Sequence, residues 1–375
     1  MEFLTSGVHY TLSFILILSV IVFIHEFGHY FVAKLCGVKI DTFSIGFGKE
    51  LFGINDRSGT RWKFSLLPFG GYVKMHGDMG AASTPDTENL NAMSEDEKRI
   101  SFHFKPLWQK ALIVAAGPIA NFILTIGILT WFLYTTGVAS SEPVVGEILP
   151  DTPAQAAGLI AGDRITAIDG KEVRSFSDIP NMIATNLGTP VTLSIERAEE
   201  QLSLTLTPVA YEDKDALGNP VKRPLIGIKS QQMTVEDFTF PEAVWESTKR
   251  TYQLCEMSLR FLGQMIMGDR SPDELKGPVG IAKMSGQVTQ TGDTVGETTR
   301  MILWFIAMLS ANLGLVNLLP IPMLDGGHLA YYAIEGVRGK PMAQRFQEYG
   351  FRFGFGLIIC LMAFTLYNDL RQMLF

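Results

Sequence analysis

The sequence predicts a polytopic α-helical membrane protein with about four transmembrane helices, a membrane-associated β region and an inserted α+β domain. Hydrophobic residues make up 47% of the 375 residues and charged residues only 18%, whereas soluble domains average about 25% charged residues. Four apolar stretches approach the roughly 20 residues that a spanning helix needs. They cover residues 10–33, 111–138, 301–324 and 353–368, of which the last is the shortest.

Composition also excludes several classes of protein. The net charge of −7 leaves no basic footprint for nucleic acid. The three cysteines, Cys36, Cys255 and Cys360, are far apart and form no CxxC motif, which argues against a disulfide framework and a cysteine zinc site. The chain starts without the basic segment and small-residue cleavage site of a signal peptide. We therefore interpret the first apolar stretch as a retained span, with the lipid bilayer as its surroundings.

The distribution of lysine and arginine predicts the orientation of the spans, because cytoplasmic loops are enriched in both. Residues 1–10 contain none, residues 34–110 contain eleven, and residues 335–352 contain four. We expect the N-terminus outside and both basic loops in the cytoplasm. The long segment 139–300 then lies outside.

Two segments follow the first span on the cytoplasmic side. Residues 38–76 alternate apolar and polar side chains between glycines, which predicts short β-hairpins at the membrane surface. Residues 77–98 are small, polar and acidic and indicate a linker.

Residues 142–210 have the pattern of a compact α+β domain. The run VVGEILPDTPAQAAGLIAGDRITAIDGKEV predicts a strand, a short helix, a Gly-Asp turn and a second strand. It resembles the PDZ domains found in bacterial proteases. Residues 242–267 are amphipathic, and either an interfacial helix or an ordinary surface helix fits them.

The segments together predict the order of domains along the chain. This order is a first transmembrane helix at 1–34, a cytoplasmic membrane-associated β region at 35–77, an acidic linker at 78–105, a second transmembrane helix at 106–138, a periplasmic PDZ domain at 142–228, a periplasmic amphipathic region at 229–297, a third transmembrane helix at 298–325, a cytoplasmic loop at 326–352 and a fourth transmembrane helix at 353–375.

The first span ends in the motif His25-Glu26-Phe27-Gly28-His29, which is HExxH. On a helix, residues four apart lie one turn apart on the same face. Two imidazoles so placed are suited to one Zn²⁺, and the adjacent glutamate is suited to act as a base for the attacking water. Ionisable groups at membrane depth are costly and usually functional. Two histidines that merely pack in a helix bundle are the alternative.

A catalytic zinc needs a third protein ligand and an open position. Glu50 follows a glycine-rich stretch, and Asp325 ends the third apolar segment after Pro320 and Pro322. Interrupted helices are tolerated at membrane depth where they are buried or line a wet cavity. The orientation argument also brings Asp325 to the same side as His29. We favour Asp325, keep Glu50 as the rival and assign His328 to the surroundings of the site.

The motifs together resemble the site-2 protease family of intramembrane zinc metalloproteases, most closely its bacterial regulator-of-sigma-E branch. The resemblance depends on their order: HEFGH, GPIANF in the second span, the PDZ-like segment, KGPVGIA, and NLLPIPMLDGGH. It implies that His25, His29 and Asp325 bind Zn²⁺ and that Glu26 is the catalytic base. It also implies that Asn312 and Asn317 hold the substrate backbone, although such amides also serve as contacts between helices.

Other residues match motifs whose roles are less specific. Gly117, Pro118 and Asn121 match the second-span motif, which we interpret mainly as a close helix contact. Residues 43–48 and 64–75 match the family's membrane-associated β region. This region offers a strand edge to an extended substrate, or is simply sheet structure.

The resemblance implies a zinc endopeptidase of the bacterial inner membrane, with its active site toward the cytoplasm. Its substrates would be single-span proteins such as anti-sigma factors, cut after an upstream site-1-type protease has acted. Remnant signal peptides would be a further class of substrate. The PDZ domain would either capture new C-termini or, as we prefer, exclude bulky substrates. One alternative is a membrane PDZ scaffold or sensor without proteolytic activity. Another is a soluble-type metalloprotease that is tethered to the membrane and uses Glu50.

Overall fold

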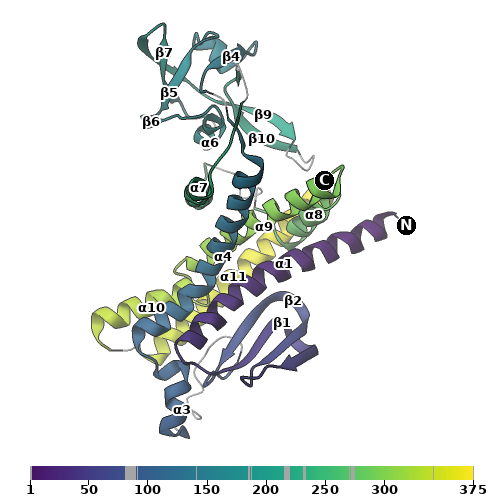
Figure 1. Ribbon diagram of the computed structural model, residues 1–375, viewed down its shortest axis with the longest axis vertical. Coiled ribbons are helices and arrows are strands. Elements are labelled where there is room, and N and C mark those ends of the chain that lie inside the picture. The colour runs from purple at the N-terminus through teal and green to yellow at the C-terminus, as the bar shows by residue number, and fades with distance from the viewer. Residues whose placement is uncertain are drawn as a thin grey trace. The chain divides into compact units, whose positions relative to one another are not determined.

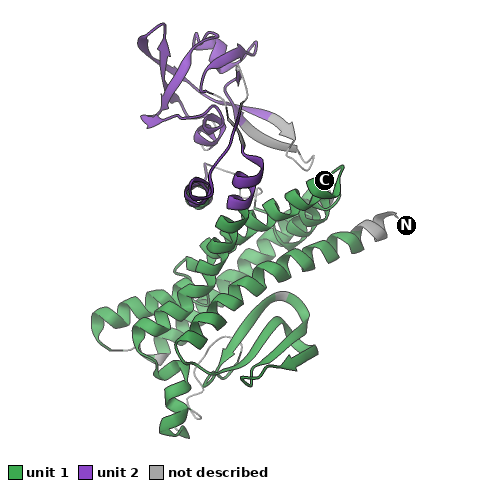
Figure 2. Ribbon diagram, viewed as in Figure 1, with its two compact units in different colours: residues 1–128, 250–255, 271–375 green, residues 129–249, 256–270 purple. Residues whose placement is uncertain are grey.

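The computed structural model describes residues 2–80, 90, 92–140, 142–184, 186, 188–214, 220–230, 234–269, 271, 275–340 and 342–374. Part of the predicted acidic linker, residues 81–89 and 91, therefore lies outside the described residues. The chain divides into two compact units, shown in Figure 2. We call Met1–Ile128, Arg250–Cys255 and Ser271–Phe375 the membrane unit, and Leu129–Lys249 with Glu256–Arg270 the β-rich unit.

Long apolar helices dominate the membrane unit. They are α1 (Glu2–Leu35), α4 (Leu107–Thr136, whose last turns belong to the β-rich unit), α9 (Val295–Leu318) and α11 (Gln344–Leu374). Within the described residues, four helical segments are long and apolar enough to cross a membrane: Gly7–Leu35, Leu107–Thr136, Val295–Leu318 and Arg345–Gln372. The prediction of about four such helices is confirmed on length and composition. The fourth is longer than the short apolar stretch indicated.

The third helix ends earlier than the apolar pattern predicts. The uncharged stretch runs to Leu324, but α9 stops at Leu318, because Pro320 and Pro322 lack the N–H groups that a continuing helix needs. A new helix, α10, starts at Asp325 and runs to Arg338. Much of the segment expected as a cytoplasmic loop is thus helical.

A shorter helix, α8 (Pro278–Val288), packs against α1 within the membrane unit. A Cβ atom added at Gly286 would fall 1.8 Å from the Tyr10 ring, so only glycine permits this approach. The first turn of α8 is held by α11. The buried Asp369 carboxylate accepts the N–H groups of Gly277 and Gly280 at 3.0 and 2.9 Å. This carboxylate satisfies backbone donors that a helix start leaves unpaired.

Residues of the predicted β region form one long hairpin where we expected short ones. Strands β1 (Ile40–Asn55) and β2 (Arg61–Met75) pair antiparallel beside α1 (Figure 1). The part of the hairpin next to α1 is buried, and the stacked rings of Phe43 and Trp62 have their centroids 4.3 Å apart. Further along, large apolar side chains are exposed: Leu51, Phe52, Ile54, Phe64, Leu66 and Leu67. The linker after it contains α3 (Glu95–Ile100) and the 3₁₀ turn η1 (Phe102–Phe104).

The β-rich unit is built on a four-stranded antiparallel sheet in the order β6-β5-β7-β8. Its strands are Lys171–Glu172, Arg164–Ile168, Val191–Arg197 and Glu200–Leu206 in that order. The short helices α5 (Pro153–Ala156) and α6 (Asp178–Ile183) lie in the connections. Further strand pairs are β4 (Val145–Ile148) with β11 (Ile228–Ser230), β9 (Val209–Lys214) with β10 (Pro220–Leu225), and β3 (Val138–Ser140) with β12 (Thr234–Glu236).

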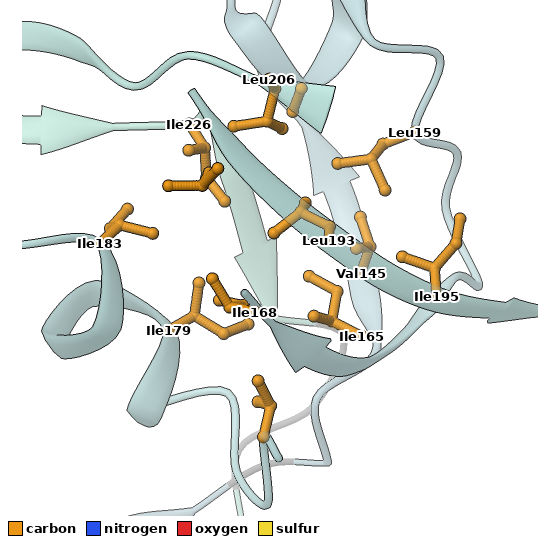
Figure 3. Close-up of a cluster of buried hydrophobic side chains, with 13 residues drawn as sticks. Val145, Leu159, Ile165, Ile168, Ile179, Ile183, Leu193, Ile195, Leu206 and Ile226 are labelled. Carbon is orange, nitrogen blue, oxygen red and sulfur yellow. The ribbon is translucent and has the colours of Figure 1, made fainter. Parts of the chain in front are cut away.

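The core of the β-rich unit is aliphatic. Figure 3 shows Ile179 and Ile183 of α6 facing the same cluster as Ile168 and Leu193 of the sheet. Asp163 is a buried charge beside this core, and both its oxygens accept hydrogen bonds from Arg197, at 2.7 and 2.8 Å. Burial alone would favour the protonated acid. The bonds from Arg197 and from the Ile160 N–H nevertheless hold the pKa of Asp163 below its ordinary value.

The amphipathic segment predicted at 242–267 is the helix α7 (Phe240–Met267), which begins with a capping box between Thr239 and Glu242. Exposed apolar side chains recur every seven residues along it: Trp245, Tyr252, Leu259 and Ile266. The helix is therefore amphipathic as predicted, and the choice between an interfacial and an ordinary surface helix stays open.

Candidate metal centre

His25 and His29 lie one turn apart near the C-terminal end of α1, and both are buried. Their Nε2 atoms are 3.2 Å apart. The HExxH spacing alone explains this pairing, since residues i and i+4 share a helix face. The two rings are nearly perpendicular, with their centroids 4.9 Å apart. One face of α1 therefore presents two imidazole nitrogens to a single point.

Asp325 reaches the same point from the other end of the sequence. Its Oδ2 lies 3.2 Å from His25 Nε2 and 3.5 Å from His29 Nε2. One ligand atom from each of the three residues lies within 4.8 Å of the others. Within the described part of the chain, this is the one cluster of three or more such side chains suited to a metal ion.

The turn between α9 and α10 places Asp325, and it is tightly constrained. Met323 has a φ of 87°, a left-handed conformation that is strained for a residue other than glycine. Gly326 and Gly327 follow, and a Cβ on either would lie within 2.4 Å of a carbonyl oxygen of the preceding turn. The two glycines of the DGG motif thus allow the backbone to fold back on itself directly at the site.

Close approach of α4 to α1 completes the walls of the site. A Cβ on Gly28 would lie 2.3 Å from the Ala116 carbonyl oxygen, and a Cβ on Gly117 would lie 2.3 Å from His29 Nε2. The ring of His29 is oriented by α4, since its Nδ1 is 2.9 Å from the carbonyl oxygen of Ile113. A carbonyl can only accept, so Nδ1 carries the proton and Nε2 keeps its lone pair for a metal.

The donor set fits a cation such as Zn²⁺. Asp325 Oδ2 is buried and has no hydrogen-bond partner in the structure. Two nitrogen lone pairs and a carboxylate oxygen facing one another at 3.2–3.5 Å repel unless a positive charge lies among them. Ligand atoms on a tetrahedral zinc, each about 2.0–2.2 Å from the ion, are separated by roughly this distance. Two histidines and a carboxylate are also a known catalytic zinc set.

Glu26 lies beside the ligands and is half-buried. A Cβ on Gly71 of strand β2 would be 3.0 Å from Glu26 Cγ. The β1–β2 hairpin therefore passes directly over the glutamate. The same added Cβ would lie 2.8 Å from Val22 Cγ1, so strand β2 and helix α1 are in close contact at Gly71.

The remaining predicted residues have different surroundings. Asn312 and Asn317 lie half-buried on α9, and the Asn312 amide donates to the Met308 carbonyl oxygen at 3.0 Å. Glu50 lies on the hairpin and pairs with Arg61, whose hydrogen bond lowers the pKa of the Glu50 carboxyl. It does not belong to the metal-suited cluster, so the geometry favours Asp325 over Glu50. His328 is half-buried in the first turn of α10.

Two groups that touch the histidines are not among the site residues predicted from the sequence. The Ile113 carbonyl is a backbone atom and leaves no signal in the sequence. The amide of Asn121 is 3.1 Å from His25 Nδ1, and Asn121 is fully buried. Its polarity within an uncharged span is the one signal in the sequence for a role at the site.

Comparison with known proteins identifies the family of the chain. The model of peptidase family M50 matches residues 13–361. The chain belongs to this family, the site-2 proteases. It is 41% identical over 369 residues to a protein named as a zinc metalloprotease in Agrobacterium fabrum, covering 97% of this chain and 96% of that protein. It is 38% identical over 377 residues to metalloprotease MmpA of Caulobacter vibrioides, covering 96% and 95%.

A solved structure resembles a smaller part of the chain. The PDZ domain of an SdrC-like protein from Listeria monocytogenes is 28% identical to it, covering 25% of this chain and 90% of that one, with a TM-score of 0.19.

The protein is therefore a zinc metalloprotease with several apolar helices, a membrane protein of family M50. The family membership confirms the enzyme class and the zinc cofactor that the motifs implied. It also removes the alternative of a scaffold without enzymatic activity.

Proposed function

We propose that this metalloprotease is an intramembrane endopeptidase that cuts the membrane-spanning segment of single-span proteins. One observation carries the proposal. The cluster of His25, His29 and Asp325 lies among the long apolar helices of the membrane unit and outside the β-rich unit. A protease whose metal lies among spanning helices is suited to a peptide bond at membrane depth.

In this proposal each residue near the cluster has a defined task. His25, His29 and Asp325 would hold the zinc ion. Bound zinc supplies Lewis acidity, which activates water as a nucleophile near neutral pH. Glu26 takes the proton from the attacking water and delivers it to the leaving amine.

Two further elements would bind the substrate. A spanning helix hides its backbone in its own hydrogen bonds, so the substrate must be extended before it can be cut. Asn312 and Asn317 offer amides to the extended backbone, and β2 offers a strand edge close to Glu26. The exposed apolar side chains of the hairpin suit such a position in lipid.

The β-rich unit would select substrates. We propose that residues 142–228 form a PDZ domain outside the bacterial inner membrane and act as a size filter. Substrates such as anti-sigma factors would pass only after a site-1-type protease has removed their outer part. Remnant signal peptides, which lack such a part, would pass directly.

The first test is cleavage of a single-span model substrate by the purified full chain in detergent, with zinc content measured in parallel. Glu26→Gln keeps the size of the side chain but removes the base. We expect the zinc content to be unchanged and the cleavage rate to fall about 10²–10⁴-fold.

Glu50→Gln is the matched control and should retain both its zinc and its activity. Asp325→Ala should lose zinc. Full activity of Glu26→Gln, or zinc loss in Glu50→Gln but not in Asp325→Ala, would refute the assignment.

The filter has its own test. Deletion of residues 142–227 should allow cleavage of substrates that still carry a large outer domain, while trimmed substrates are cut as before. If the deleted protein cuts neither but still binds zinc, the domain captures substrates and does not filter them.

A further inference from the structure

The side chain of Asn121 in α4 is fully buried and touches a proposed zinc ligand. Its Nδ2 atom lies 3.1 Å from His25 Nδ1. Its Oδ1 atom has no hydrogen-bond partner. A buried amide oxygen without a donor costs free energy, typically about 1–3 kcal/mol. The pairing of this amide therefore needs a physical account.

The backbone of Asn121 is fixed by the neighbouring helix. Its carbonyl oxygen accepts hydrogen bonds from Ser310 of α9 and from Thr125, both at 3.0 Å. The Thr125 hydroxyl, which has a single hydrogen, lies 3.0 Å from both the Asn121 and the Ala307 carbonyl oxygens and so bridges α4 and α9. A Cβ on Gly314 would lie 3.3 Å from Asn121 Cβ. The amide group therefore lies against His25. The remaining choice is which of its two atoms, Oδ1 or Nδ2, faces His25 Nδ1, and a half-turn about the Cβ–Cγ bond exchanges them.

The two orientations of the amide have opposite consequences for His25. If Nδ2 donates to Nδ1, the proton of the neutral ring lies on Nε2, which faces Asp325 and cannot bind a metal. If the amide makes a half-turn, Oδ1 accepts a proton from Nδ1, and Nε2 keeps its lone pair. Oxygen and nitrogen of an amide are assigned from such hydrogen-bond networks. The second orientation pairs Oδ1 with Nδ1–H and moves Nδ2 to the position that Oδ1 now holds.

We propose that Asn121 is a positioning residue that accepts a hydrogen bond from Nδ1–H of His25. It thereby directs Nε2 of His25 toward the zinc ion. For His25 it does what the Ile113 carbonyl does for His29. The two histidines of one motif thus have different outer partners, a side chain and a backbone carbonyl, both supplied by α4. This inference rests on the zinc site proposed above.

The variants Asn121→Asp and Asn121→Leu separate the two orientations. A carboxylate accepts a hydrogen bond from Nδ1–H but cannot donate one, and leucine does neither. We expect Asn121→Leu to weaken zinc binding about 10–100-fold, the usual cost of losing an outer partner of a metal ligand. Asn121→Asp should bind zinc within a few-fold of the unchanged protein. Gly127→Ala is the matched control on the same helix, because no atom lies near its Cβ position and the contacts of Asn121 stay unchanged.

The measurement is the zinc dissociation constant of the full chain in detergent, obtained by competition with a chelator. Zinc binding by Asn121→Leu as tight as by the unchanged protein would overturn the proposal. So would Asn121→Asp being as weak as Asn121→Leu, because the carboxylate keeps the acceptor on which the proposal depends. His25→Ala separates this inference from the ligand assignment. If that variant keeps its zinc, the ligand set itself is wrong.

A measurement on the unchanged chain needs no folded variant at position 121. In the zinc-loaded protein labelled with ¹⁵N-histidine, the imidazole shifts of His25 should report a protonated Nδ1 and an Nε2 without a proton. The signal is assigned by its loss in His25→Asn. The reverse pattern, with the proton on Nε2, would overturn the proposal.

Discussion

The core of the β-rich unit consists of aliphatic side chains, whereas the membrane unit buries histidine, asparagine, serine and threonine between its helices. A domain in water is stabilised by removing apolar surface from water. Helices in lipid gain little in this way, and they associate through small residues and polar contacts. Gly28, Gly117, Thr125 and Ser310 are such residues here. The polar contacts that hold these helices together also surround the candidate metal centre.

The largest test of this comparison is a methyl group at Gly117. A Cβ there would lie 2.3 Å from His29 Nε2 and 2.9 Å from His25 Cε1. We expect Gly117→Ala to displace both rings and to weaken zinc binding by more than the roughly 10–100-fold that an outer partner contributes. Gly127→Ala is the control on the same helix, since no atom lies near its Cβ position. Equal zinc affinity of the two variants, measured by chelator competition, would contradict the close contact.

The β-rich unit should respond to a cavity in its own way. Leu193 is fully buried in its core. We expect Leu193→Ala to lower the free energy of opening of β5, β7 and β8 by about 2–5 kcal/mol, with zinc affinity unchanged. Hydrogen exchange of the full chain measures this opening. Ile160→Ala, which removes a side chain that is 49% exposed, should cost far less. A parallel loss of zinc would mean that the units are not independent.

A smaller effect is expected where α11 holds α8. Asp369→Ala leaves the N–H groups of Gly277 and Gly280 without their acceptor. The free energy of opening of α8 should fall by about 1–3 kcal/mol. Asp369→Asn keeps one acceptor oxygen and should lie between. Exchange rates of residues 278–288 measure both, and rates unchanged in both variants would exclude this role for the carboxylate.

The smallest effect is the pH dependence of the β-rich unit. The folded-state pKa of Asp163 is lowered, so its ion pair with Arg197 stabilises the fold fully above the unfolded-state pKa of about 3.9. That stability is lost as the pH falls below this value through the folded-state pKa. Asp163→Asn should remove this part of the acid sensitivity. Unfolding midpoints of the domain between pH 3 and 7, compared for the two proteins, are the measurement. Identical pH profiles would show that the pair contributes nothing.

The sequence predicted the four long apolar helices and the pairing of His25 with His29. Both predictions depend on local signals, namely hydropathy over some twenty residues and the HExxH spacing. The grouping of Asp325 with His25 came from loop charge and chain order. What could not be read depends on contacts between distant segments. The contact of Asp369 with α8 is an example. The outer partners of the histidines belong to the same class. The end of α9 at Leu318 has a local cause instead, because Pro320 and Pro322 interrupt a stretch that hydropathy alone extends to Leu324.

The proposed ligands are divided between the two ends of the chain, with His25 and His29 near its beginning and Asp325 near its end. Synthesis therefore makes the first two ligands long before the third. A nascent chain with only its first two spanning helices inserted has no complete ligand set. The same holds for any fragment that ends before α10. With the proposed ligand set, we therefore expect the enzyme to be inactive until nearly all of it has been made.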